Sequence, residues 1–498
     1  MTARDETVTT AARPGADAVT AGYEMVVGLE VHVQLRTATK AFCNCPTEFG
    51  APPNVNTCPV CLALPGTLPV LNHRAVELAT RAALALRCVV HERSTFARKN
   101  YFYPDLPKGY QITQYDTPLA TGGQLAIGVH RDGTPIQIGI TRVHLEEDAG
   151  KSIHDRYPGS TAIDLNRAGV PLIEIVSEPD LRSAVEAGAY LRTLKQLLEY
   201  LDVSDVNMEE GSLRVDANVS ARRRGDAMLG TKTEVKNLNS FSGVERALDA
   251  EFARQCAVLA AGGRVEQQTM LWDERRGAVR AARLKEASHD YRYFPEPDLP
   301  PLVLATDWIE RVKRSLPELP ADRRARFAAE YGLPAYDIEV LTTTPALADY
   351  FESVARPHRD PKAAANWVMG EVMASLNATR GTIQRFPVRP ADLARLLDMV
   401  RAGLISHSAA KVIFARMVES GDRPEQIAER DGLLKVGDDQ ALAGWIDAVL
   451  AEHPAEAARF LGGERRLQGV LVGMVMKKSG GRADPKRVNQ LLVERVTG

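Results

Sequence analysis

The chain has 498 residues, of which 45% are apolar and 25% are charged, and its formal net charge is -2 with a pI of about 6.6. This composition is typical of a folded soluble protein, and the near-neutral charge excludes nucleic-acid binding through overall charge alone. At roughly 150 residues per domain, the length predicts roughly two to four domains. No apolar run approaches the ~20 residues that span a bilayer, and we expect a cytoplasmic protein.

The first 300 residues are expected to hold a short tail followed by one mixed domain. Residues 1–22 are rich in Thr and Ala and lack the apolar stretch of a signal peptide, which predicts a disordered tail. Over residues 23–300, strand-like and helix-like patterns intermix without a regular βα alternation. This mixture predicts the α+β class.

Alternation of apolar and polar residues predicts three strands in this domain, at 25–35, 137–145 and 213–220. In the first strand, one face is apolar and the other polar; they are formed by Leu29, Val31, Val33 and Leu35, and by Glu30, His32 and Gln34. A helix is predicted between the second and third strands, because apolar residues recur at helical spacing. These residues are Val185, Leu191, Leu194, Leu198 and Leu201.

A proline-rich stretch at 293–334 predicts a domain boundary. We expect a linker and the start of a helical domain at 301–350, followed by helices and a tail domain at 351–498. Three amphipathic helices are predicted there. Their apolar residues are Leu393, Leu396, Leu397 and Val400; Val412, Ile413, Met417 and Val418; and Leu467, Val470, Leu471, Met474 and Val475.

Four of the six cysteines form two pairs inside the segment 42–62. The pairs are Cys43-x-Cys45 and, after twelve residues, Cys58-x-x-Cys61. Four thiolates on two short loops suit tetrahedral zinc, and a site closed by four protein ligands is structural rather than catalytic. The alternative is a set of four reduced structural thiols.

Acidic and histidine residues cluster at strand ends, and such oxygen and imidazole ligands suit Mg²⁺ or Mn²⁺ with a nucleotide. Glu30 and His32 point the same way from one strand. The other candidates follow later strands, and they are His144, Glu146, Glu147, Asp148, Glu209, Glu210 and Asp216. The alternative is that these residues are solvated strand faces and salt-bridge partners.

Cationic and aromatic residues are mixed at 98–105, where the sequence reads RKNYFYPD. This mixture suits phosphate together with a base or a tRNA end. A second polar segment around Lys236 is expected to reach the same cleft. The alternative is a surface loop whose rings fill a small satellite core.

The C-terminal tail carries a dense set of basic residues around a Ser-Gly-Gly turn at 479–481. They are Lys477, Lys478, Arg482, Lys486 and Arg487. In a chain whose net charge is -2, such a patch is expected to follow an RNA backbone. The alternative is a solvated helix face.

Several motifs together resemble the B subunit of the aspartyl/glutamyl-tRNA(Asn/Gln) amidotransferases, the GatB/GatE family. The match runs over nearly the whole chain beyond residue 23. The motifs are 27–34 (VGLEVHVQ), 98–105 (RKNYFYPD), 144–152 (HLEEDAGKS), 164–167 (DLNR), 171–180 (PLIEIVSEPD), 208–214 (MEEGSLR), 235–240 (VKNLNS), 290–298 (DYRYFPEPD), 476–485 (MKKSGGRADP) and 488–492 (VNQLL).

The resemblance implies a heterotrimer. Its A subunit, an amidase-type glutaminase, would supply ammonia through a channel, and a small C subunit would complete the complex. The B subunit would use ATP to phosphorylate the side-chain carboxylate of Glu-tRNA(Gln) and/or Asp-tRNA(Asn), and ammonia would then displace the phosphate. The resemblance also implies a cradle-like catalytic domain, an all-helical domain and a helical YqeY-like tail that contacts tRNA.

The resemblance also implies roles for individual residues. Glu30, His32, Glu147 and Glu210 match positions that hold Mg²⁺, while Glu146, Glu209 and Asp216 are expected beside them or at a second metal. Cys43, Cys45, Cys58 and Cys61 match the zinc-bearing members. Contacts to ATP are expected from Lys99, Asn100, Tyr101, Lys151 and Lys236.

Two other functions fit the same sequence. One is a non-catalytic, zinc-containing scaffold that binds tRNA, which would not turn over ATP. The other is a self-sufficient ATP-dependent ligase for a small acid, which would need neither a partner chain nor tRNA.

Overall fold

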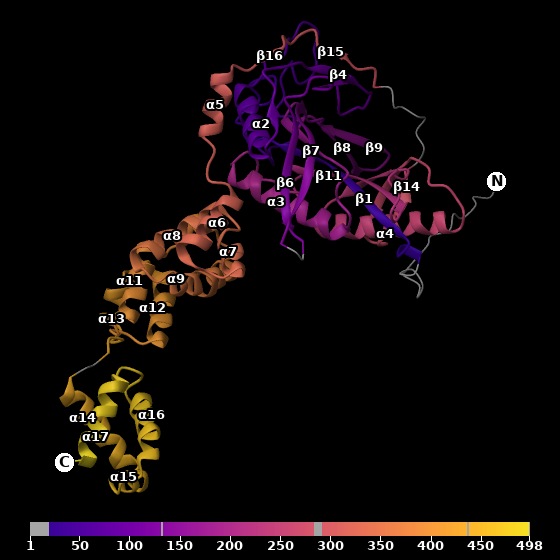
Figure 1. Ribbon diagram of the computed structural model, residues 1–498. Coiled ribbons are helices and arrows are strands. Elements are labelled where there is room, and N and C mark those ends of the chain that lie inside the picture. The colour runs from indigo at the N-terminus through magenta and orange to yellow at the C-terminus, as the bar shows by residue number, and fades with distance from the viewer. Residues whose placement is uncertain (1–18, 131–132, 283–290, 436–437, 498) are drawn as a thin grey trace. The chain divides into compact units, whose positions relative to one another are not determined.

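The computed structural model describes residues 19–130, 133–282, 291–435 and 438–497. It divides the chain into two compact units, Met1–Pro320 and Ala321–Gly498, which we call the sheet unit and the helical unit (Figure 1). Most of the predicted tail, residues 1–18, lies outside the described residues.

The sheet unit is built on a 12-stranded sheet in the order β14-β13-β12-β11-β1-β10-β7-β5-β4-β15, with β6 joining β7 to β2. Among the described strands, β12 and β13 run parallel, and the other pairs of this sheet run antiparallel. The strands are β1 (Tyr23–Gln34), β2 (Val89–Val90), β4 (Ala97–Asn100), β5 (Tyr110–Thr113), β6 (Ala120–Val129), β7 (Pro135–Glu147), β10 (Pro171–Ser177), β11 (Leu213–Arg223), β12 (Thr233–Leu238), β13 (Thr269–Asp273), β14 (Ala278–Ala281) and β15 (Phe294–Pro295). Two small sheets pair β3 (Arg93–Ser94) with β16 (Leu302–Val303), and β8 (Lys151–Tyr157) with β9 (Ser160–Asp164).

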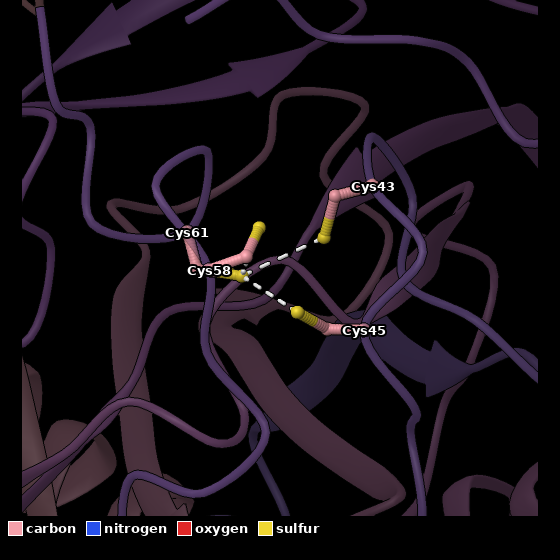
Figure 2. A group of neighbouring side chains, drawn as sticks. All are labelled: Cys43, Cys45, Cys58 and Cys61. Carbon is pink, nitrogen blue, oxygen red and sulfur yellow. Dashed lines mark hydrogen bonds between the residues drawn. The ribbon is translucent and has the colours of Figure 1, made fainter.

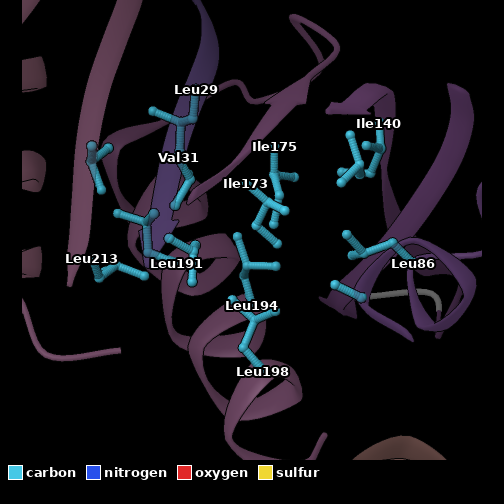
Figure 3. Close-up of a cluster of buried hydrophobic side chains, with 14 of the residues drawn as sticks. Leu29, Val31, Leu86, Ile140, Ile173, Ile175, Leu191, Leu194, Leu198 and Leu213 are labelled. Atoms are coloured by element: carbon cyan, nitrogen blue, oxygen red, sulfur yellow. The ribbon is translucent and has the colours of Figure 1, made fainter. Parts of the chain in front are cut away.

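Helices cover the apolar face of the large sheet. They are α2 (His73–Ala85), α3 (Ala184–Tyr200) and α4 (Phe241–Ala260), and α5 (Thr306–Arg314) packs on α2. Side chains stop two of these helices from fraying at their start: Asn72 accepts hydrogen bonds from the first turn of α2, and Ser183 does so for α3. Figure 3 shows apolar side chains of β1, β10 and β11 beside Leu191, Leu194 and Leu198 of α3, while Ile140 of β7 lies on the side of Leu86.

The alternation predicted for β1 is confirmed. Its apolar residues Leu29, Val31 and Val33 are fully buried in the core, while the polar residues between them lie on the opposite, half-buried face. The strand at 213–220 alternates in the same way. For the helix predicted between the second and third strands, which is α3, one apolar residue is wrongly placed. Val185 is 69% exposed, because the buried face of α3 includes Ala187 instead.

The helical unit contains no strand among its described residues. Its elements are α6 (Pro320–Tyr331), α7 (Ala335–Leu341), α8 (Pro345–His358), α9 (Pro361–Trp367), the π-helix η1 (Val368–Val372), α10 (Met373–Thr379), η2 (Ile383–Arg385), α11 (Pro390–Arg401), α12 (His407–Ser420), α13 (Pro424–Arg430), α14 (Asp439–Glu452), α15 (Pro454–Leu461), η3 (Arg465–Leu467), α16 (Gln468–Lys478) and α17 (Pro485–Thr497). A mixed sheet followed by helices confirms the predicted fold class.

The helical unit has two separate hydrophobic cores, one among α6–α13 and the other among α14–α17. The three predicted amphipathic helices correspond to α11, α12 and α16. Two residues assigned to their apolar faces are nevertheless half exposed, Val412 at 49% and Val470 at 47%. No helix in the described part of the chain is both long and apolar enough to cross a membrane.

Candidate metal and nucleotide site

The polar face of the large sheet brings two histidines and two glutamates together. Backbone pairing sets His32 of β1 opposite Glu174 of β10, and Glu174 opposite His144 of β7. Directly paired residues of antiparallel strands point to the same face, and Glu146 lies on that face too because it is two residues beyond His144. We call His32, His144, Glu146 and Glu174 the carboxylate–histidine group.

The side-chain atoms of this group lie within ligand distance of one another. His32 Nε2 is 3.3 Å from Glu174 Oε2 and 3.6 Å from Glu146 Oε1. One ligand atom from each of these three residues fits within a 4.8 Å cluster. The side chains of Glu146 and Glu174 are only 2% and 9% exposed, so water does little to screen their charges.

The electrostatics of the group indicate an excess of negative charge. Burial lowers the pKa of His32, but the hydrogen bond to Glu174 and the charges of Glu146 and Glu174 outweigh it and raise the pKa. Burial raises the pKa of Glu30 on the same face, and the charges of Glu174 and Glu234 raise it further. Burial opposes ionisation of Glu146 and Glu174, but His144 and His32 outweigh it and lower the pKa of both, so these carboxylates are ionised and able to bind a cation.

His144 and Arg142 orient the carboxylates. His144 Nε2 is 3.7 Å from Glu146 and 3.6 Å from Glu174, while Arg142 Nε donates to His144 Nδ1 at 3.4 Å. A donor at Nδ1 requires the ring proton to be on Nε2, where it faces the two carboxylates. The donor set of two oxygens and one imidazole from His32 therefore fits a hard divalent cation such as Mg²⁺ or Mn²⁺.

Of the four predicted magnesium ligands, the structure brings only His32 into this group. Glu30 accepts a hydrogen bond from Asn218 Nδ2 at 2.9 Å on the neighbouring strand. Glu147 points to the other face, because consecutive residues of a strand alternate, and there it pairs with Lys108 and accepts from Ile112 N at 2.9 Å. Glu210 is exposed on the turn before β11.

Glu174 and His144 complete the group, and Glu174 is not among the residues predicted from the sequence. A signal for it exists in the sequence. Glu174 is the only charged residue in the mainly apolar strand 171–177, and a carboxylate buried in such a strand must have a polar partner or a metal. His144 had been selected only as a neighbour of the acidic cluster.

A cavity of about 300 Å³ lies on the same polar face beside Glu30. Val26, Val176 and Leu229 contribute apolar walls, and Asn218 and Lys232 contribute polar groups. Such a cavity, largely apolar with a few placed polar groups, is typical of small-molecule sites. Because Glu30 both lines the cavity and feels the charge of Glu174, the cavity adjoins the carboxylate–histidine group.

The remaining predicted ATP contacts do not line this cavity, although Lys236 lies near it. Lys236 forms ion pairs with Glu234 at 2.9 Å and with Asp216 at 2.7 Å, and Asp216 is paired with Glu30 across the strands. Lys151 is exposed at the start of β8. Lys99, Asn100 and Tyr101 lie together at the end of β4, where Asn100 binds backbone carbonyls of the segment before β15.

The four predicted zinc ligands come together from two loops (Figure 2). Cys61 Sγ lies 3.5 Å from Cys43 Sγ and 3.7 Å from the sulfurs of Cys45 and Cys58. A tetrahedral zinc with bonds of ~2.3 Å separates its sulfurs by about 3.8 Å, whereas a disulfide requires about 2.05 Å. The arrangement thus fits zinc, and all four cysteines are free.

Lys40 supplies a buried positive charge to this cysteine cluster. Its side chain is 1% exposed, and its Nζ donates to Asn56 O at 2.7 Å, to Leu165 O at 3.2 Å and to Cys61 Sγ at 3.4 Å. The hydrogen bond with Cys43 lowers the pKa of Cys61, and together with the charge of Lys40 it brings the value to about 4 although burial opposes it. Lys40 therefore favours the ionised form of Cys61.

Comparison with known proteins assigns the chain to a family. A family model described as the GatB/GatE catalytic domain matches residues 25–310, and one described as the GatB domain matches residues 349–496. The chain belongs to the GatB/GatE family. The B subunit of the aspartyl/glutamyl-tRNA(Asn/Gln) amidotransferase of Moorella thermoacetica is 54% identical over 95% of this chain and all of its own length. The proteins of that name from Geotalea daltonii and Thermosynechococcus vestitus are 53% and 51% identical, each over 96% of this chain and 100% and 98% of their own lengths.

The carboxylate–histidine group, the adjoining cavity and the cysteine cluster all lie within the region matched by the GatB/GatE catalytic domain. The basic tail residues lie within the region matched by the GatB domain. Several of them already have acidic partners there: Lys478 pairs with Glu452, and Arg487 with Asp439. Arg482 lies over the Trp445 ring, and no ion pair joins Lys477 or Lys486 to a described residue.

Proposed function

We propose that this chain is the B subunit of a tRNA-dependent amidotransferase that forms Gln-tRNA(Gln) and/or Asn-tRNA(Asn). Its own task would be to phosphorylate the side-chain carboxylate of the mischarged aminoacyl-tRNA with ATP. The observation that carries the proposal is the carboxylate–histidine group, which lies beside a small-molecule cavity in a chain of the GatB/GatE family.

In this proposal, His32, Glu146 and Glu174 hold a divalent cation, and the cavity beside Glu30 holds the nucleoside of ATP. Asn218 orients Glu30 at the cavity wall, and Lys232 offers a positive charge to the nucleotide. When bound, the cation neutralises the negative charges of the triphosphate and of the substrate carboxylate. Glu30, Asp216 and Glu147 would act around this centre rather than as its ligands, and Glu210 would act from the exposed turn.

The chemistry proceeds in two steps. A carboxylate oxygen of the substrate attacks the γ-phosphorus of ATP, the bond from that phosphorus to the bridging oxygen breaks, and ADP leaves. Ammonia then attacks the acyl carbon, inorganic phosphate leaves, and the nitrogen loses a proton to give the amide. The chain's contribution to the first step is mainly positioning, because the carboxylate–histidine group is fixed on three neighbouring strands.

The partners belong to the proposal as well. The A subunit, an amidase-type glutaminase, would supply ammonia, a small C subunit would complete the heterotrimer, and the assembly would work in the cytoplasm. The tail would contact the tRNA body, mainly through Lys477 and Lys486, since other basic tail residues are paired internally. The cysteine cluster would hold a structural zinc that replaces a hydrophobic core in its loops.

The test is ATP hydrolysis by the purified complex with and without Glu-tRNA(Gln), with Asp-tRNA(Asn) measured in parallel. The proposal predicts stimulation by a mischarged tRNA and formation of the amide. A scaffold protein would bind tRNA without stimulated hydrolysis, and a small-acid ligase would hydrolyse ATP without tRNA. Either result would overturn the proposal.

A further inference from the structure

Four tyrosines gather at one end of the polar face, and we call Tyr101, Tyr115, Tyr291 and Tyr293 the tyrosine cluster. The rings of Tyr115 and Tyr293 are stacked, with centroids 4.0 Å apart and planes within 4° of parallel. The ring of Tyr291 stands edge-on to Tyr293 at 6.0 Å and to Tyr101 at 6.2 Å. The cluster is thus a continuous aromatic surface rather than four separate side chains.

Three adjacent strands hold the cluster in place. Tyr101 directly follows β4, Tyr115 follows β5, and Tyr291 and Tyr293 precede β15. β4 pairs with both β5 and β15, and β4 and β15 lie side by side in Figure 1. The backbone N of Asn100 donates to Tyr291 O at 3.0 Å, and its side chain donates to Arg292 O at 2.8 Å. The rings therefore have a fixed support.

The cluster adjoins the carboxylate–histidine group. Thr113, two residues before Tyr115, pairs with Glu146 through the backbone and lies 3.2 Å from Glu146 Oε2 through its hydroxyl. Burial raises the pKa of Tyr293, and the nearby charges of Glu174 and Glu146 raise it further. A substrate group that rests on these rings would thus lie next to the proposed reaction centre.

These rings do not fill a core. Within the described chain, none of the four belongs to a hydrophobic core cluster or packs against one. Tyr115 is 48% exposed although Tyr293 covers one face of its ring. A flat, exposed aromatic face next to a cation is what single-stranded nucleic-acid sites present to a base. Here the cation is Lys99, whose Nζ lies 4.8 Å from the Tyr291 ring centre.

We propose that the tyrosine cluster binds the 3′-terminal adenosine of the aminoacyl-tRNA by stacking on the exposed Tyr115, while Lys99 contacts the phosphate that precedes it. This inference rests on the proposed function. In the substrate, only a ribose and the amino acid separate that base from the carboxylate to be phosphorylated. A base held at the cluster can therefore present its carboxylate to the neighbouring carboxylate–histidine group.

The adenine of ATP is the other adenine in this reaction, and the geometry assigns it elsewhere. The cavity beside Glu30 lies among β1, β10 and β11, whereas the tyrosine cluster follows β4 and β5 beyond β7. Besides burial, the charges of Glu174, Glu234 and Asp216 raise the pKa of Glu30. The charges of Glu146, Glu147 and Asp148 do the same for the pKa of Tyr101. The carboxylate–histidine group lies between these two sets, as a centre that joins two substrates requires.

The test compares the wild-type complex with Tyr115→Ala, Tyr115→Trp and the control Tyr157→Ala. Tyr157 is a matched control because it is 52% exposed and lies at the end of β8, outside the cluster. We expect Tyr115→Ala to raise the KM for Glu-tRNA(Gln) roughly tenfold or more, since stacking of one base is worth that much, and to leave the KM for ATP unchanged. Tyr115→Trp should restore tRNA binding.

A second readout reports stacking directly. The terminal adenosine of the tRNA is replaced by 2-aminopurine, whose fluorescence falls when the base stacks. We expect quenching by the wild type, Tyr115→Trp and Tyr157→Ala, but not by Tyr115→Ala. An unchanged KM for tRNA with unchanged quenching in Tyr115→Ala would overturn the inference, as would a rise in the KM for ATP alone. In both cases tRNA-stimulated hydrolysis by the wild type would leave the proposed function standing; loss of that stimulation in the wild type would overturn both.

Discussion

Two buried carboxylate sites, one in each unit, differ in how their charge is balanced. In the helical unit, Glu352 is surrounded by donors: Arg323 at 2.6 Å, Arg326 at 2.7 Å, Arg356 at 2.9 Å and the Tyr331 hydroxyl at 3.0 Å. In the sheet unit, Glu146 and Glu174 share two histidines, and Arg142 is 3.6 Å from Glu174.

The difference separates a structural site from a functional one. Glu352 has more cations than it needs, and they lower its pKa to about 2 although burial opposes them. In the carboxylate–histidine group, burial likewise opposes ionisation, but the pKa values of Glu146 and Glu174 are lowered mainly by His144 and His32, so both carboxylates stay ionised beside neighbours that are themselves metal ligands. Loss of a carboxylate should therefore reduce activity in the sheet unit and stability in the helical unit.

The largest effect is expected for Glu174→Gln. This change removes one negative charge and keeps the shape of the side chain, so we expect tRNA-stimulated ATP hydrolysis to fall on the order of 10²–10³-fold. The midpoint of thermal unfolding is measured in parallel, so that a loss of activity can be separated from a loss of the fold. Glu199→Gln, on α3 and away from the polar face, is the control and should keep full activity. A stable and fully active Glu174→Gln complex would remove the distinction between the two sites.

The opposite result is expected for Glu352→Gln. Arg323, whose side chain is 8% exposed, would lose its buried partner, and removal of one member of a buried pair costs about 3 kcal/mol. Urea denaturation followed on the helical unit should report this loss. An exposed pair provides the control: Glu419→Gln, which separates Glu419 from Arg416, should change stability by less than about 0.5 kcal/mol. Equal losses in the two variants would contradict the structural role of Glu352.

The stabilising contribution of Glu352 should also appear in the pH dependence of stability. The folded pKa of Glu352 is about 2, below its usual value of 4.5, so its ionised form stabilises the fold above pH 4.5. This contribution is lost as the pH falls from about 4.5 toward 2, and after allowance for solvent screening it amounts to about 2 kcal/mol. Acid titrations of unfolding should show this step in the wild type and not in Glu352→Gln. A step of the same size in the variant would show that other titratable groups cause the loss of stability.

A smaller effect is expected at the cysteine cluster, where Lys40→Met removes the buried cation beside Cys61. Four thiolates around zinc carry an uncompensated double negative charge, so release of zinc to a chelator should become several-fold faster. The measurement is zinc appearance over time, with Lys151→Met as an exposed control. Zinc that leaves both variants and the wild type at one rate would show that Lys40 only fills space.

The alternation of apolar and polar residues predicted strands of the sheet unit, but it did not predict which residues form the carboxylate–histidine group. Alternation placed Leu29 and Val31 in the core and His32 on the polar face, because burial of one face fixes the strand's orientation. The sequence did not tell which of the neighbours Glu146 and Glu147 faces His32, since that depends on where β7 pairs with β10. The meeting of His32 with Glu174 depends on the same long-range register.

The cysteine cluster was easier to predict because its ligands are close in sequence. Cys43, Cys45, Cys58 and Cys61 lie on two adjacent loops, and their spacing alone brings four sulfurs within reach of one ion. The supporting role of Lys40 could not be predicted, because its contact to Leu165 spans 125 residues. Likewise, the stack of Tyr115 on Tyr293 joins segments that no sequence pattern connects.

The metal-binding role of the carboxylate–histidine group can be measured by electron paramagnetic resonance of Mn²⁺ bound to the wild-type complex and to Glu174→Gln, in the presence of a non-hydrolysable ATP analogue. We expect one tightly bound Mn²⁺ in the wild type and its loss in the variant, while both proteins retain zinc. Equal Mn²⁺ binding by the two proteins would show that the carboxylate–histidine group does not hold the metal.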